Sequence, residues 1–420
     1  NILIRQARII APGTPQHNKT FDILIEGGVI TTIKKSITAR NNVKVIEAKN
    51  LRVSAGWTDL QAVSCDPGYE HKEDLDTMIR CAAAGGFTAV CVHSYNQPPL
   101  HNKSQIEYVI NKTRNKVVDV LPFGTVTVEA KGKDLAEMYD MKLSGAAAFS
   151  DYKNPVKDAG TMMRALQYGD NIGALIMAHC NDHSISHGGQ MNEGEVSTTL
   201  GLKGMPGLAE ELMLQRNISV LEYAGGRLHI PVISTKNSLD LIKKAKAAGL
   251  SITCGVAAAN LLLDDSALED FDTNYKLDPP LRNKKDVMAL RNGVENGLID
   301  VIVSDHSPQD PESKELEFDH ADFGMLNLQT AFNCALEGMG EKNIDSIVRA
   351  FTEGPQRVLG LETHQIGEGA AANLTLFSVG DSTTFTPKDN YSRSANSPFF
   401  NREMAGSVIG VINGSRSFFN

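Results

Sequence analysis

The feature that most constrains the fold is a regular alternation of short apolar runs with amphipathic stretches between residues 53 and 361. The apolar runs lie at 55–60, 87–92, 117–122, 146–149, 174–178, 228–233, 251–256 and 300–304. Helix-like stretches between them lie at 72–84, 103–112, 134–142, 160–170, 208–223, 239–248 and 284–296, and closing helices are expected at 327–337 and 344–352. Eight strands separated by helices must run parallel, which predicts an α/β fold with a (β/α)₈ TIM barrel over residues 53–361.

The two ends of the chain have a different pattern. Residues 1–52 contain runs that alternate apolar and polar side chains, separated by Gly and Asn turns, and β-like runs return at 372–377 and 403–413. This period of two is typical of strands with one buried face. We therefore expect a small β-sandwich built jointly from residues 1–52 and 362–420.

Charge and composition exclude several classes of protein. The net charge is −9 and no cluster of Lys and Arg stands out, so we expect no nucleic-acid partner. No run of about 18 apolar residues is present, which argues against a membrane span, and the N-terminal residues do not have the pattern of a signal peptide. The six cysteines are dispersed without a CxxC motif, as in a cytoplasmic protein with reduced thiols.

The stretch at 58–71, TDLQAVSCDPGYEH, follows the first barrel strand and resembles the metal-binding signature of the dihydroorotases, Asp-x-His-x-His-x-Arg-x-Pro-Gly. The matching positions are Asp59, Pro67 and Gly68. Gln61 and Val63 stand where the resemblance places two histidine metal ligands. Cys65 stands where it places an arginine that binds the substrate.

The resemblance extends over nearly the whole chain, including segments at 71–75, 82–88, 188–195, 278–286, 322–331 and 397–400. It implies an amidohydrolase of the dihydroorotase and hydantoinase group, with a barrel inserted into a β-sandwich. The implied reaction is the reversible cyclisation of N-carbamoyl-aspartate to dihydroorotate in pyrimidine biosynthesis. The family uses zinc, and bound metal lowers the pKa of a water toward 7 and polarises the amide carbonyl.

Only part of the implied metal site is present. The resemblance identifies Asp151 and His179 as retained metal ligands and Asp305 as both a ligand and the general acid/base. Val232 stands where a second histidine ligand belongs. We expect Gln61, Val63, Asp151, His179, Val232 and Asp305 to cluster at the C-terminal mouth of the barrel, where TIM barrels carry their active sites.

The implied substrate pocket also departs from the family pattern. Tyr95 and Asp278 stand where asparagines are expected, and Gln309 stands where a histidine is expected. Tyr152 and Lys153 likewise do not match the family segment after the fourth strand. With the arginine replaced as well, no cationic side chain is available by resemblance to hold the acid group of the substrate.

The three retained ligands would be divided between two metal positions, so we predict no binuclear zinc site. No cofactor is expected, or at most a single weakly held zinc.

Four functions remain open at this point. The first is a catalytically inactive dihydroorotase homologue that forms a dimer or binds a partner such as aspartate carbamoyltransferase, as both active and inactive barrels of this group do in some bacteria. The second is an amidohydrolase with altered chemistry that uses Asp305 as its base. The third is residual dihydroorotase activity, and the fourth is a small-molecule binding module.

Overall fold

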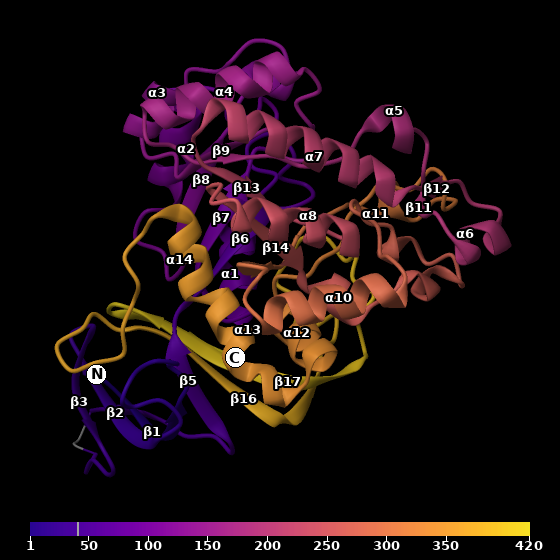
Figure 1. Ribbon diagram of the computed structural model, residues 1–420. Coiled ribbons are helices and arrows are strands. Elements are labelled where there is room, and N and C mark those ends of the chain that lie inside the picture. The colour runs from indigo at the N-terminus through magenta and orange to yellow at the C-terminus, as the bar shows by residue number, and fades with distance from the viewer. Residues whose placement is uncertain (40–41) are drawn as a thin grey trace.

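Eight parallel strands form the barrel in a computed structural model that describes residues 1–39 and 42–420 (Figure 1). In spatial and chain order they are β6 (Trp57–Val63), β7 (Phe87–His93), β8 (Asp119–Gly124), β9 (Ala148–Ser150), β10 (Ile176–Met177), β13 (Leu228–Ile230), β14 (Ile252–Ala257) and β15 (Val301–Val303). Each overlaps one apolar run of the sequence, so the TIM-barrel prediction is confirmed. Every residue of β6 is buried, as expected for a parallel strand covered on both faces.

Hydrogen bonds close the barrel between its first and last strands. The backbone N–H of Val63 donates to the carbonyl of His306 at 3.1 Å, and the N–H of His306 donates to the carbonyl of Gln61 at 3.2 Å. Beside them, Asp59 accepts hydrogen bonds from the backbone N–H and the hydroxyl of Ser304, each at 2.7 Å. The retained aspartate of the sequence motif therefore joins β6 to the end of β15.

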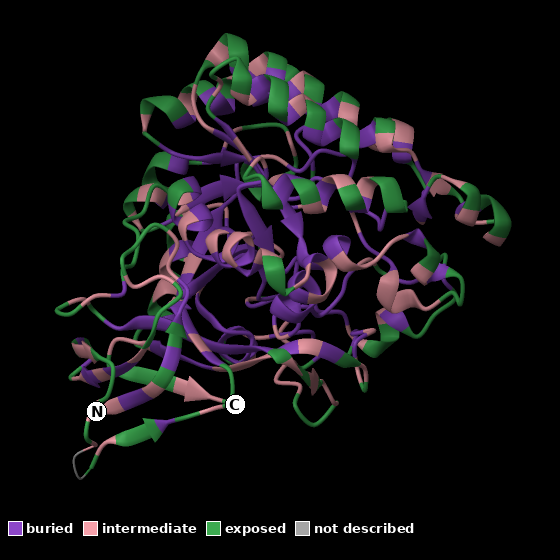
Figure 2. Cartoon of the chain, turned by 60° about the horizontal axis from the view of Figure 1, so that its bottom comes forward, coloured by how far each residue is buried: buried purple, intermediate pink, exposed green. Residues whose placement is uncertain are grey.

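Helices surround this barrel on its outer side. They are α1 (Leu75–Ala84), α2 (Lys103–Thr113), α3 (Met138–Leu143), α4 (Ala159–Asn171), α5 (His183–Ser186), α6 (Glu195–Leu200), α7 (Gly207–Ala224), α8 (Lys236–Ala247), α9 (Ala258–Leu262), α10 (Lys284–Glu295), α11 (Pro311–Lys314), α12 (Ala331–Met339), α13 (Ile344–Phe351) and α14 (Glu353–Leu359). Several begin at side-chain caps: Asp74, Asn102, Asp158, Thr235 and Asn283 each accept a hydrogen bond from the first helical turn. Figure 2 shows buried residues in the strands and mixed burial along the outer helices.

Strands from both ends of the chain form a second, mostly antiparallel sheet. Its members are β1 (Ile2–Ile9), β2 (Thr20–Glu26), β3 (Val29–Lys34), β4 (Lys44–Ile46), β5 (Leu51–Ala55), β16 (Asn373–Thr384), β17 (Glu403–Asn413) and β18 (Arg416–Phe419). The two ends meet where β5 pairs antiparallel with β16, with Ala55 opposite Leu374. This confirms one sheet from both termini, while the domain bounds 1–52 plus 362–420 and 53–361 stay a prediction.

Several short elements lie outside the expected pattern. The helices α5, α6, α9, α11 and α14 were not anticipated, nor was the small pair of strands β11 (Met191–Asn192) and β12 (Gly204–Met205). They have too few residues to show a periodic pattern in sequence. No described helix is long and apolar enough to cross a membrane.

Trp57 packs at the junction between the barrel and the terminal sheet. It is fully buried, and its ring centroid lies 4.9 Å from Phe332, 5.3 Å from Phe351 and 5.2 Å from Phe377. Phe377 belongs to β16 and the other two rings to α12 and α13. One side chain at the start of β6 thus contacts both parts of the fold.

We predict that Trp57→Ala lowers the free energy of unfolding by about 3–5 kcal/mol, because it removes a large buried ring and leaves a cavity. Urea denaturation of the whole chain measures this. Tyr223→Ala is the matched control, since Tyr223 is 80% exposed, and it should change stability by less than about 0.5 kcal/mol. Equal losses for the two variants would show that the junction carries no special stability.

Candidate functional site at the barrel mouth

Several sequence-predicted residues lie at the C-terminal ends of the barrel strands. Gln61 and Val63 belong to the end of β6, His179 follows β10 by two residues, and Asp305 follows β15 by two. Gln61 is 3% exposed, and His179 and Asp305 are each 7% exposed. The strand ends therefore carry a mixture of buried polar and apolar groups.

A buried ion pair occupies this mouth. Lys153, which follows β9, places its Nζ 2.9 Å from Oδ2 of Asp305. The amide nitrogen of Gln61 lies 3.4 Å from the other carboxylate oxygen, Oδ1. Burial opposes the charged form of Lys153, but the Asp305 carboxylate raises the pKa of the lysine above its ordinary value. Burial also raises the pKa of the Asp305 carboxyl, and Lys153 lowers it against that effect. The 2.9 Å contact is typical of a charge-assisted hydrogen bond between an ammonium group and a carboxylate.

A second pair lies beside the first. Nε2 of His179 is 3.4 Å from Oδ2 of Asp278, and the Asn181 amide approaches the other oxygen of Asp278 at 3.4 Å. Burial would raise the pKa of Asp278, but His179 and Lys153 outweigh it and hold that pKa at about 2. The structure thus brings His179 and Asp278 together, although the resemblance implied a metal ligand at His179 and a substrate-pocket residue at Asp278.

Asp151 has its contacts elsewhere. Its Oδ1 accepts hydrogen bonds from the backbone N–H groups of Val126 at 2.8 Å and Thr127 at 3.0 Å, and Oδ2 accepts from the Thr127 hydroxyl. Burial raises the pKa of Asp151 to about 6, against these hydrogen bonds. The contacts account for a buried carboxylate without a metal, so a ligand role for Asp151 remains only a prediction.

Apolar and aromatic groups fill part of the mouth. Val63, Cys65 and Tyr152 form one buried cluster, with Tyr69 and Tyr95 packed against it. The ring of Tyr95 lies 5.6 Å from that of Tyr69 and 5.9 Å from that of Tyr152. Burial, the largest contribution, raises the pKa of the Cys65 thiol, so this cysteine is not an activated nucleophile.

Gln309 is held by neighbouring groups. Its carbonyl oxygen accepts a hydrogen bond from Lys72 Nζ at 2.6 Å, and its amide nitrogen donates to the carbonyl of Phe323 at 2.9 Å. Lys72 also lies 3.8 Å from Asp310 and 3.6 Å from Asp322. The charge of this lysine is therefore already balanced by carboxylates.

These residues do not fit a two-zinc centre. Val63 and Val232 offer no donor atom, and Val232 packs in the barrel interior with residues such as Met177 and Ala257. The Asp305 carboxylate faces an ammonium group, and Asp151 faces the turn at 126–127. A zinc site needs several nitrogen, sulfur or oxygen ligands around one point, and the retained set does not supply them.

Other histidines near the barrel are bonded within the chain. Nε2 of His93 lies 3.1 Å from the Leu60 carbonyl, and Nδ1 of His229 lies 2.8 Å from the Thr253 hydroxyl. Burial lowers the pKa of both to about 3, so both are neutral at physiological pH. Neutral, internally bonded rings favour a structural role.

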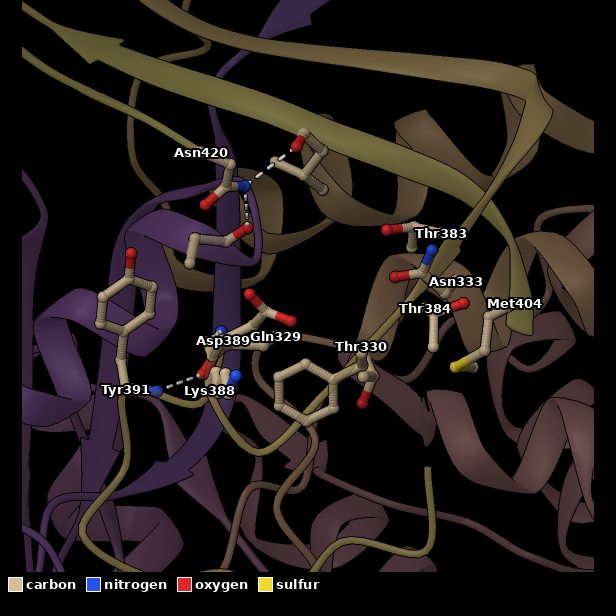
Figure 3. A pocket seen from close by; sticks show the side chains of 13 residues that line it. Gln329, Thr330, Asn333, Thr383, Thr384, Lys388, Asp389, Tyr391, Met404 and Asn420 are labelled. Atoms are coloured by element: carbon tan, nitrogen blue, oxygen red, sulfur yellow. Dashed lines mark hydrogen bonds between the residues drawn. The ribbon is translucent and has the colours of Figure 1, made fainter. Parts of the chain in front are cut away.

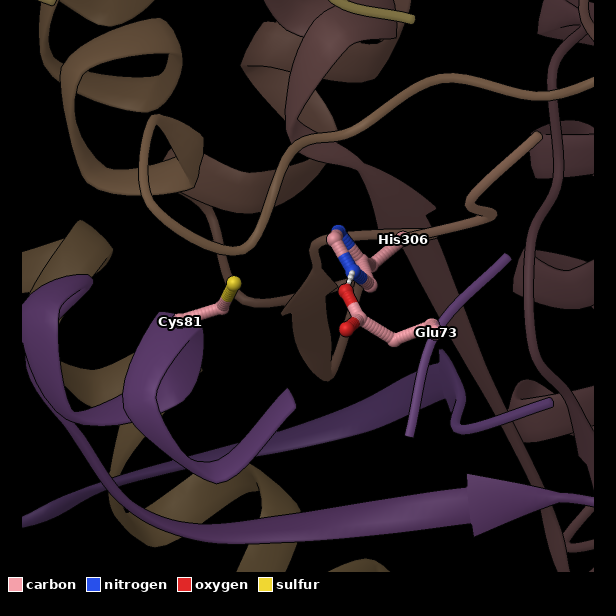
Figure 4. Close-up of side chains that lie close together, drawn as sticks. All are labelled: Glu73, Cys81 and His306. Atoms are coloured by element: carbon pink, nitrogen blue, oxygen red, sulfur yellow. Dashed lines mark ion pairs between the residues drawn. The ribbon is translucent and has the colours of Figure 1, made fainter. Parts of the chain in front are cut away.

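One other group resembles a metal site by composition. Within residues 1–39 and 42–420, Glu73, Cys81 and His306 are the only three such side chains whose ligand atoms all lie within 4.8 Å of one another (Figure 4). Nδ1 of His306, however, accepts hydrogen bonds from the backbone N–H groups of Asn327 and Leu328. Its proton is therefore on Nε2, which faces Glu73 at 3.6 Å. His306 is therefore held in place by these contacts, and the three side chains are not free to act together as metal ligands.

A pocket of about 320 Å³ lies outside the barrel, between α12 and the C-terminal strands (Figure 3). Its polar groups contact each other: the Gln329 side chain accepts from the Tyr391 N–H at 2.9 Å, and Asn420 donates to the carbonyls of Ala84 and Val408. At the mouth, Gln61 Oε1 and Tyr152 Oη are buried without a hydrogen-bond partner, whereas no residue that lines this pocket has such an atom. The mouth is therefore the stronger candidate site.

Two important contacts were missed from the sequence. Lys153 was noted only as a mismatch, and Glu73 was not singled out as the partner of His306. A lysine two residues after the strand-end Asp151 was the only signal in the sequence for the first. No local pattern predicts the second, because the two residues are more than 200 positions apart.

We predict that Asp151→Ala lowers the free energy of unfolding by about 1–3 kcal/mol, because two buried N–H groups lose their acceptor. Glu317→Ala is the control, as that side chain is 89% exposed. Denaturation and metal analysis of both variants should show a stability loss for Asp151→Ala and no change in metal content. Loss of bound metal without loss of stability would instead identify Asp151 as a ligand.

Comparison with known protein sequences points to one family. A model described as "Dihydro-orotase-like" matches residues 52–238. A dihydroorotase of Trichlorobacter lovleyi is 35% identical and covers 100% of this chain and 99% of its own, and a dihydroorotase of Geotalea daltonii is 37% identical over 98% of this chain and 97% of its own.

Solved structures show the same fold. The L-hydantoinase (dihydropyrimidinase) of Arthrobacter aurescens superposes with a TM-score of 0.86 at 20% identity, covering 99% of this chain and 95% of its own. A D-hydantoinase of a Thermus species gives 0.80 at 22% identity, covering 100% and 97%. The full-length identity to the bacterial dihydroorotases, together with the barrel and its terminal sheet, shows that this chain belongs to the dihydroorotase family.

Proposed function

We propose that this chain is a dihydroorotase-family barrel that no longer catalyses the cyclisation of N-carbamoyl-aspartate and acts as a structural or regulatory partner in a complex. The observation that carries the proposal is the ion pair between Lys153 and Asp305 at the mouth. The residue that the family resemblance identifies as the acid/base is held by a cation of the chain itself.

The proton chemistry of Asp305 supports this proposal. A general base must present a free lone pair to the group that it deprotonates. Here Lys153 lies against Oδ2 and the Gln61 amide approaches Oδ1, so each carboxylate oxygen already has one partner within the chain. An altered hydrolysis with Asp305 as its base would have to proceed with the Lys153 ammonium group held against the carboxylate.

Substrate binding has lost its expected groups as well. Cys65 replaces the arginine and packs in an apolar cluster, and Gln309 is bonded to Lys72 and Phe323. Arginine binds a carboxylate through two parallel N–H groups, which neither cysteine nor glutamine can supply. An acidic cyclic amide would therefore find no cationic group dedicated to it.

The outer face of α7 supports a role in association. Leu208 is 51% exposed, Leu212 is 47% exposed and Tyr223 is 80% exposed. Their spacing of four and eleven residues places them along one side of the helix. Apolar side chains aligned on a surface are typical of protein–protein contact sites. We propose that this side of α7 contributes to a homodimer or to binding of an aspartate carbamoyltransferase.

We expect the purified chain to show no turnover above background when zinc is supplied. Dihydroorotate hydrolysis and N-carbamoyl-aspartate cyclisation are both measured with purified full-length chain, with an active dihydroorotase as the positive control. Robust metal-dependent turnover that disappears in Asp305→Asn would refute the loss of catalysis.

The expected result for association is a stable complex with the aspartate carbamoyltransferase of the same cell, or a homodimer, in size-exclusion chromatography with light scattering. Leu212→Glu should weaken that association, because it places a charge in an apolar contact. Met288→Glu is the control, since Met288 is 61% exposed on α10. A monomer that binds neither partner would contradict the proposed role.

A further inference from the structure

One carboxylate at the mouth, Asp305, has a cationic partner from the chain, and a second, Asp278, lies beside a histidine. Asp305 pairs with Lys153 at 2.9 Å, and Asp278 pairs with His179 at 3.4 Å. The side chains of Lys153 and Asp305 are 16% and 7% exposed. The charge of Asp305 is therefore balanced without any group from outside the protein.

We propose that the Lys153 ammonium group is a built-in substitute for a metal cation: it neutralises Asp305 and excludes divalent ions from the mouth. The inference deepens the proposed loss of catalysis, but it does not depend on the identity of a partner. It assigns to Lys153 a positioning and charge-balancing role that its sequence mismatch alone did not indicate.

The local backbone and packing hold Lys153 in place. Tyr152, the preceding residue, has φ 55°, in the left-handed region that side-chain-bearing residues rarely adopt. Nζ of Lys153 also lies 5.5 Å from the centre of the Tyr152 ring, within the range of a cation–π contact. The turn after β9 thus places the ammonium group between an aromatic face and the Asp305 carboxylate.

Burial explains why such a cation is needed. A carboxylate removed from water is strongly unfavourable unless a partner of opposite charge compensates it. Asp305 is held at the end of β15 beside the seam that closes the barrel, and neither Val63 nor Val232 can bring a metal ion to it. Lys153 supplies the compensation that metal would supply in a zinc-binding barrel.

The same geometry disfavours a divalent ion. A metal that coordinated Asp305 would lie close to the ammonium group on Oδ2, and like charges at such distances repel strongly where little water is present. Val63 and Val232 carry no donor atom, so they cannot form metal bonds that would offset this repulsion. Lys153 therefore acts in addition to the missing histidines, and the two effects can be measured separately.

A double-mutant cycle tests the charge balance. Lys153→Met should lower Tm by several degrees, because Asp305 is left buried and unpaired. The double variant Lys153→Met with Asp305→Asn should melt closer to the wild type than Lys153→Met alone. Additive effects of the two substitutions would show that the pair is not coupled and would overturn the proposal.

A zinc titration tests the exclusion of metal. The background carries Gln61→His, Val63→His and Val232→His, which return donors to the strand ends. Adding Lys153→Ala to this background should tighten zinc binding by at least about tenfold, because the competing ammonium is removed. Adding Lys246→Met instead is the control and should leave zinc affinity unchanged. The partner of Lys246 is Asp300, at 2.6 Å, which is not one of the strand-end residues of the mouth.

Equal zinc affinity with and without Lys153 would overturn the exclusion. This failure can be distinguished from failure of the proposed function, because the wild-type chain could still lack turnover. Conversely, turnover by a wild-type chain with an intact, coupled ion pair would refute the loss of catalysis and leave the charge substitution standing.

Discussion

The structure depends on the seam that joins the first barrel strand to the last. Asp59 accepts two hydrogen bonds from Ser304, and the backbone of Gln61 and Val63 pairs with His306. A parallel barrel has no stable open edge, so this seam has to be kept whatever happens to the chemistry. It also places Asp305 beside Gln61, whose amide nitrogen lies 3.4 Å from the Asp305 carboxylate.

Once the seam fixes Asp305 in a buried position, its charge must be compensated. In this chain the compensation comes from Lys153, and the neighbouring space is filled by Val63, Cys65 and tyrosine rings. Cys65, Tyr152 and Asp305, which follow three of the barrel strands, have left-handed φ values of 58°, 55° and 52°. Such strain of about 1–3 kcal/mol per residue persists only where the surrounding structure imposes it. The strand ends at the mouth therefore keep this backbone geometry with the side chains that the chain carries there.

The fold was largely predictable from the sequence because long, periodic apolar runs define the eight strands and the terminal sheet. Short elements such as α5 and α9 were missed, since four or five residues carry no readable period. At the mouth, the sequence indicated which positions had changed, but side-chain direction decided what they do. Asp151 turns to Val126 and Thr127, whereas Lys153, two residues later, reaches Asp305. Neither direction follows from motif spacing, because both depend on the turn after β9 and on strands distant in sequence.

In our proposal, Lys153 takes the place of a metal cation at the barrel mouth. The most direct measurement is a crystal structure of the wild-type chain grown with zinc, with anomalous diffraction recorded at the zinc edge. We expect the Lys153 ammonium against the Asp305 carboxylate and no anomalous peak between the strand ends. Zinc peaks coordinated by Asp305, with Lys153 turned away from it, would contradict the account.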